Sequence, residues 1–250
     1  MRLPQQLAAS LSLLVVLAAA PTAWASHEVQ TPAEPGMTAL PPEERGDILM
    51  ARGEYLAAID AYRSAPVNAV TLNKTGIAYH HLLAIDLAKK DYQQALLIRP
   101  NYPEAINNLG AAYFAEHNYR KAIKLYRKAL QLMPKSAVVA ANLGTAFFAR
   151  GDYKPGIEAY RIAFADDPEV FTSSSQTISG PTSASDRAHQ DYCIAELFAQ
   201  AGMLDHAIEY LRKAFDEGFA DRNKLMQDQE FAKLRQTAQF AQLMAEQKLH

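Results

Sequence analysis

The sequence predicts an all-α protein, an α-solenoid of repeated helical hairpins, from three observations. Alanine, the best helix former, occurs 45 times, against 20 valines and isoleucines, which favour strands. Several residue types recur in one register, 34 positions apart. Each copy ends on a proline, which breaks a helix. A mainly β protein is therefore excluded.

Composition narrows the function classes. The 250 residues carry a net charge of −2, so no bulk attraction to nucleic acid or anionic lipid is expected. A hydrophobic content of 49% is enough for a folded core. The one cysteine, Cys193, excludes an internal disulfide framework and a four-cysteine zinc site.

Residues 1–25 have the layout of a cleavable secretory signal. Arg2 gives a positive start, residues 7–20 are mostly apolar, and Ala23 and Ala25 are the small residues before a cleavage point. The apolar run is shorter than the roughly 20 residues that span a membrane. We expect a chain secreted into the periplasm without stable membrane insertion; an uncleaved anchor is the alternative.

After a flexible leader, which we place at residues 26–40, an internal repeat organises the chain. Four kinds of residue recur every 34 positions. They are Gly76, Gly110 and Gly144; Tyr92, Tyr126 and Tyr160; Ala95, Ala129 and Ala163; and Pro100, Pro134 and Pro168. A fixed period of this length is typical of stacked helical repeats.

Each column has a physical reason if the unit is two antiparallel helices, A and B. We expect the glycine, as at Gly110, to let helix B approach helix A closely, opposite a small residue such as Ala122. Aromatic side chains then fill the space between one pair and the next. The proline stops helix B before the next helix A begins.

This pattern resembles the tetratricopeptide repeat, a 34-residue helix–turn–helix. Residues 103–136 carry the resemblance best, with Leu109, Gly110, Tyr113, Ala122, Tyr126, Ala129 and Pro134. The resemblance implies a right-handed α-solenoid of about five repeats. We place repeats 1–4 at residues 41–168 and repeat 5 at 188–220.

Two segments depart from the register. Residues 169–187 are rich in Ser and Thr and are predicted to be a loop, either a passive linker or a lid over the groove. Residues 221–250 contain three short amphipathic stretches. We expect Phe231, Leu234, Phe240 and Leu243 to pack on the last repeat as a cap, because a solenoid's end must be covered.

The resemblance also implies a binding site, since this family typically binds proteins or peptides in a concave groove lined by the A helices. The groove candidates by register are Asn73, Asn107, Asn108, Phe114, Asn142, Thr145 and Phe148. Asn108 and Asn142 occupy matching positions, so their amides could form a ladder that hydrogen-bonds a peptide backbone. Alternatively, these asparagines are family residues without a ligand.

Another family mode, which clamps a terminal carboxylate with Lys and Asn, is not expected. Glu43 and Asp47 stand at those positions in the first repeat and would repel a carboxylate.

Arg120, Lys121, Lys124, Arg127 and Lys128 form a basic helix. A solvated convex face is the simpler interpretation. The alternative is a docking patch for an acidic partner or an anionic envelope polymer. A nucleic-acid partner is disfavoured because no aromatic stacking platform accompanies the charges.

No catalytic residues, metal site or cofactor are predicted. His80 and His81 are adjacent and diverge by about 100° on a helix. His189 and Cys193 stand four apart, but no further zinc ligands are evident.

The sequence therefore predicts a non-catalytic scaffold or adaptor of the cell envelope that binds another protein or peptide in the A-helix groove. The rival is a permanent subunit of an envelope complex, docked through its convex face. The partner's identity and the oligomeric state stay open.

Overall fold

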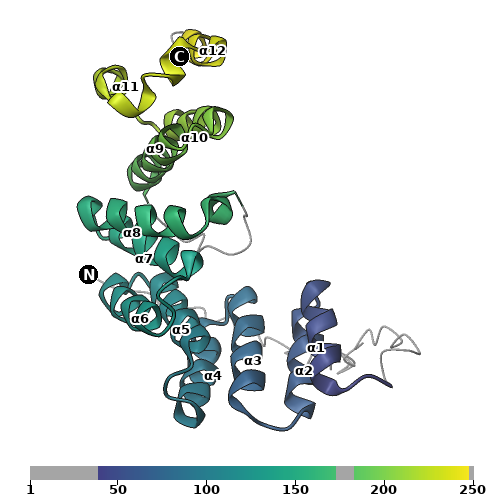
Figure 1. Ribbon diagram of the computed structural model, residues 1–250. Helices are drawn as coiled ribbons and strands as arrows, with labels where there is room; N and C mark the ends of the chain where they lie inside the picture. The colour runs from purple at the N-terminus through teal and green to yellow at the C-terminus, as the bar shows by residue number, and fades with distance from the viewer. Residues whose placement is uncertain (1–38, 173–182, 248–250) are drawn as a thin grey trace, which may run out of the picture. The chain divides into compact units, whose positions relative to one another are not determined.

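The computed structural model describes residues 39–172 and 183–247, and all regular structure in these ranges is helical. The predicted signal peptide, and all but the last two residues of the predicted leader, lie outside the described residues. Consecutive helices pack against each other as pairs, and each pair packs on the next, as the ribbon shows (Figure 1). The predicted all-α solenoid is confirmed.

The first four pairs follow the predicted register. Their bounds are α1 Pro42–Ala51 with α2 Tyr55–Ser64, α3 Ala69–His81 with α4 Ile85–Ile98, α5 Pro103–Ala115 with α6 Tyr119–Leu132, and α7 Ala137–Ala149 with α8 Tyr153–Asp166. Helices α3, α5 and α7 therefore begin 34 residues apart. Asn68 and Ser136 cap α3 and α7 by accepting hydrogen bonds from backbone N–H groups of the first turn.

The fifth pair corrects one predicted boundary. A short 3₁₀ helix, η2, covers Pro168–Phe171, and α9 covers Ala184–Gln200, followed by α10 at Leu204–Asp216. Helix α9 thus begins within the loop predicted for residues 169–187. The physical reason is Ser183, whose hydroxyl accepts a hydrogen bond from the backbone N–H of Asp186 and caps the helix. Residues 173–182 of that loop lie outside the described residues.

The C-terminal segment is made of shorter elements than the sequence suggested. It contains α11 Arg222–Gln227, η3 Gln229–Phe231, η4 Leu234–Gln236 and α12 Ala238–Glu246. Phe231, Leu234, Phe240 and Leu243 are buried in one cluster with Phe198 and Leu211 of the fifth pair. These side chains cover the apolar end of the last repeat, which a solenoid requires for solubility.

The glycine of helix A meets a tyrosine rather than the expected small residue of helix B. A Cβ atom added at Gly110 would lie 2.7 Å from the ring of Tyr126. The same clash joins Gly46 to Tyr62, Gly76 to Tyr92 and Gly144 to Tyr160, always 16 residues apart. In the fifth pair the corresponding residues are Ala195 and Leu211, both fully buried. There a methyl group on helix A faces a side chain without a ring.

None of the helices in the described ranges is both long and apolar enough to cross a membrane.

We expect Gly110→Ala to destabilise the protein, because overpacking typically costs about 1–3 kcal/mol and exceeds the gain of roughly 1 kcal/mol in helix propensity. Tyr126→Leu should also destabilise, by leaving a cavity. The double variant recreates the pair found at Ala195 and Leu211, so it should lose less than the two single losses combined. Urea unfolding measures all three. Additive losses would show that the ring contact is not the cause.

Candidate functional site

The predicted ladder exists as a chain of hydrogen-bonded side-chain amides that joins three A helices. Asn142 Nδ2 on α7 donates to Asn107 Oδ1 on α5 at 3.2 Å. Asn107 Nδ2 donates to Asn108 Oδ1 at 3.3 Å, and Asn108 Nδ2 donates to Asn73 Oδ1 on α3 at 3.0 Å. The bonds between repeats therefore join positions 35 apart, whereas the sequence suggested positions 34 apart. We call these four residues the amide chain.

The two central amides are the ones that a ligand can reach. Asn73 and Asn142 are buried, with 5% and 3% exposure, whereas Asn107 and Asn108 are half-buried. A primary amide has two N–H groups and two lone pairs on its oxygen. The central amides each use one N–H and one lone pair within the chain. A second donor and a second acceptor per residue are left to meet a peptide backbone.

The structure corrects the prediction that Phe114 and Phe148 line a groove. Both rings are buried in the core, with 0% and 1% exposure. The Phe114 ring packs 5.3 Å from that of Tyr119, and the Phe148 ring 5.1 Å from that of Tyr160. Each phenylalanine follows a repeat glycine by four residues, so it lies on the helix face that meets helix B. That spacing was the available sequence signal.

Thr145 also acts within the fold. Its hydroxyl lies 3.1 Å from the carbonyl oxygen of Ala141 and 2.9 Å from the Tyr160 hydroxyl. The Tyr160 hydroxyl in turn donates to Gln190 Oε1 on α9 at 3.3 Å. Thr145 therefore helps to join the fourth pair to the fifth and is buried, with 7% exposure.

The acids of the first repeat are paired. Lys74 Nζ lies 2.8 Å from Glu43 Oε1 and 2.7 Å from Asp47 Oδ2. Tyr62 donates to the other oxygen of Asp47 at 2.8 Å. Burial alone would lower the pKa of Lys74, but its hydrogen bonds with Asp47 and Glu43 outweigh burial and raise it. The absence of a carboxylate clamp stays a prediction, now with a lysine already engaged by both acids.

The basic residues of α6 line an open groove, which sequence analysis considered mainly a solvated surface. Its hollow of about 550 Å³ is bordered by Arg120, Ile123, Lys124, Leu125, Arg127, Lys128, Gln131 and Arg150. A neighbouring hollow of about 400 Å³ shares Arg120 and Arg150 with it. We call the two hollows together the basic groove.

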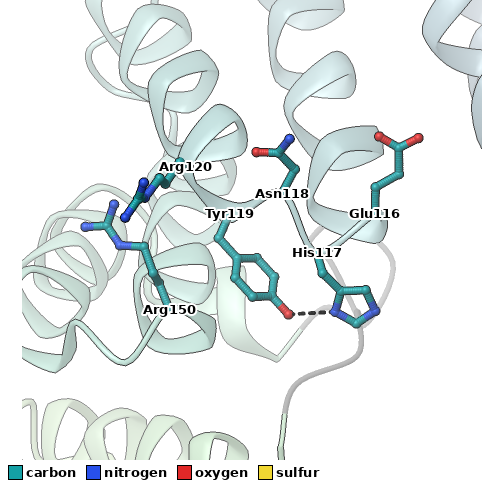
Figure 2. A pocket seen from close by; sticks show the side chains of 6 residues that line it. All are labelled: Glu116, His117, Asn118, Tyr119, Arg120 and Arg150. Carbon is teal, nitrogen blue, oxygen red and sulfur yellow. Dashed lines mark hydrogen bonds between the residues drawn. The ribbon is translucent and has the colours of Figure 1, made fainter.

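Figure 2 shows the second hollow at the turn between α5 and α6. Arg120 and Arg150 lie on one side of it, and the Tyr119 hydroxyl is 2.9 Å from His117 Nδ1 on the other. His117 has a φ of 58°, in the left-handed region that usually favours glycine. The turn holds the histidine beside the tyrosine at some cost in backbone energy.

Two half-buried carboxyl groups on α9 have raised pKa values. Burial raises the pKa of Asp191 to about 6, with Lys213 opposing the rise. Burial raises the pKa of Glu196 to about 7; Lys224 Nζ, 3.6 Å away, opposes this, and Asp228 and Glu230 add to it. In the described ranges, no three His, Cys, Asp or Glu side chains are grouped so that they could hold a metal ion.

The fold and these surfaces define a class first: a solenoid of helical hairpins. Residues 103–136 match the family model described as the tetratricopeptide repeat. The flanking pairs repeat the same register, so the chain is a tetratricopeptide-repeat protein. Repeats of this family are typically non-catalytic and mediate protein–protein interactions.

Solved structures are similar at low sequence identity. MamA is 23% identical, over 69% of this chain and 93% of that one, with a TM-score of 0.48. The protein TTC0263 of Thermus thermophilus is 18% identical, over 74% and 94%, with a TM-score of 0.49. The first repeat domain of Spaghetti, bound to an HSP90 peptide, is 28% identical, over 44% and 90%, with a TM-score of 0.42. No curated protein matches the chain.

The raised pKa values predict a pH dependence of stability. Between about pH 4.5 and 7 the folded protein binds more protons at Asp191 and Glu196 than the unfolded chain does. Their contribution to the unfolding free energy is therefore present at low pH and is lost as the pH rises. His80, whose pKa is lowered by burial and by His81, acts in the opposite direction.

The test compares the wild type with Asp191→Asn/Glu196→Gln by thermal unfolding at pH 5.5 and 7.5. The wild type should gain more Tm than the variant on going to pH 5.5, by a few degrees, at roughly 2–4 °C per kcal/mol. The exposed Glu158→Gln should behave as the wild type. Equal pH dependence in all three proteins would contradict the assignment.

Proposed function

We propose that the mature chain is a non-catalytic scaffold or adaptor of the cell envelope that holds an extended segment of a partner protein along its A helices. The observation that carries this proposal is the amide chain. Asn107 and Asn108 are fixed by Asn142 and Asn73 and keep donors and acceptors for a ligand.

Preorganisation is the physical reason to favour this surface. An amide whose orientation is already fixed by a neighbour loses little conformational entropy when it binds a peptide. Alternating N–H and C=O groups of an extended backbone suit a side chain that offers both a donor and an acceptor. Contacts to the backbone bind without demanding a particular partner sequence, which suits an adaptor.

The rival function is a permanent accessory subunit, docked through the outer B-helix face. The basic groove on α6 is the observation that favours it, since a B helix carries these charges. The two functions differ in which surface the partner needs, and single variants can separate them.

Peptides selected from a random display library on purified residues 26–250 provide the first test. Their affinity should fall at least about tenfold in Asn107→Ala/Asn108→Ala, because two backbone hydrogen bonds of roughly 1 kcal/mol each are lost. Asn223→Ala, exposed on α11, is the matched control and should bind as the wild type. If selected peptides bind the amide variant with unchanged affinity, the A-helix site is wrong.

Export is a separate expectation, which follows from residues 1–25. Expressed in a Gram-negative bacterium, the chain should appear in the periplasmic fraction with Ser26 as its first residue. Terminal sequencing of the purified protein checks this. A chain that retains Arg2 and sediments with membranes would instead indicate an uncleaved anchor.

A further inference from the structure

Helix α6 differs from the other B helices in the sign of its charges. It carries Arg120, Lys121, Lys124, Arg127 and Lys128 and no acidic residue. Helices α2, α4, α8 and α10 all mix acidic and basic residues. Mixed charges also give ion pairs within α4 and α10, Lys89 with Asp86 and Lys213 with Glu209. Helix α6 has no such compensation.

The charges of α6 also repel each other. Arg120, Lys124 and Lys128 follow each other at four-residue spacing and so lie on one face of the helix. Like charges at this spacing each cost about 0.2–0.5 kcal/mol. Within the described part of the chain, none of the five α6 cations has an ion pair with a carboxylate. The overall charge of −2 makes this face an exception on an acidic protein.

The groove beside these cations is built from two repeats. The Arg127 guanidinium lies 5.3 Å from the centre of the Phe147 ring, and that of Arg150 lies 5.5 Å from it. One buried ring therefore positions two guanidinium groups, and the largely buried Ile123 and Leu125 also line the groove. The nearby acids are engaged elsewhere: Glu116 pairs with Lys89, and Asp152 pairs with Arg150.

We propose that the basic groove binds an acidic, extended segment of a partner protein. From Arg120 to Gln131 the helix rises about 16 Å, at 1.5 Å per residue, which matches about five extended residues at roughly 3.3 Å each. Acidic residues at alternate positions of such a segment lie about 6.6 Å apart on one side. That spacing is close to the one-turn spacing of the cations, about 5–6 Å.

A protein segment fits this surface better than the other polyanions. The cations line a groove with apolar side chains, whereas a membrane surface suits an exposed apolar face flanked by charges. Nucleic acid is bound through exposed aromatic rings beside the charges, and the ring in this groove, Phe147, is buried with 3% exposure.

The test uses a fluorescein-labelled nonapeptide with three glutamates at alternate positions among serines, and fluorescence anisotropy at low salt. Lys124→Glu should weaken binding at least about tenfold. The same variant should keep or raise its Tm, because the new glutamate gains partners at Arg120 and Lys128. Loss of binding with retained stability separates loss of a docking surface from loss of folding.

Three comparisons complete the experiment. The charge-matched variant Lys90→Glu/Lys154→Glu, on α4 and α8, and the variant Asn107→Ala/Asn108→Ala should both bind the peptide as the wild type. A peptide with glutamine in place of glutamate should not bind. The second variant keeps this proposal independent of the A-helix site.

Equal weakening in Lys124→Glu and Lys90→Glu/Lys154→Glu would overturn the proposal, since only bulk charge would then matter. So would absence of peptide binding, together with Lys124-dependent binding to phosphatidylglycerol vesicles or to a single-stranded oligonucleotide. Those two results would assign the groove to a lipid surface or a nucleic acid instead.

Discussion

The close approach of helices A and B depends on one contact, between a glycine and a tyrosine ring 16 residues later. In the first four pairs the ring occupies the space where a Cβ atom of helix A would lie. The Tyr126 hydroxyl has no hydrogen-bond partner within the described part of the chain, so the ring itself is what the contact uses. The fifth pair keeps the approach with Ala195 and Leu211, by moving volume from one helix to the other.

This contact also decides which side chains can serve a ligand. With Gly110 directed at helix B, Phe114 is directed there as well, whereas Asn107 and Asn108 lie on the side that meets the neighbouring A helices. The same constraint in α3 and α7 brings Asn73 and Asn142 to either end of the amide chain. The interior packing of each pair thus aligns polar groups across three repeats.

The sequence predicted what lies within one repeat and less of what lies between repeats. Helix starts at 69, 103 and 137 follow from the glycine, tyrosine and proline columns. The amide pairing is offset by one residue, at 35, because it depends on how one hairpin is displaced against the next. The pairing of Lys74 with Glu43 and Asp47 likewise joins two repeats, so no local spacing announced it.

The two candidate surfaces differ in what they cost the fold. The amide chain contributes hydrogen bonds between repeats and therefore supports the stacking, whether or not a ligand is present. The cations of α6 repel each other and return nothing to the folded state in the absence of an anion. A patterned feature that stabilises the protein has a sufficient explanation in folding. One that destabilises it requires an explanation outside the chain, and an acidic partner segment supplies it.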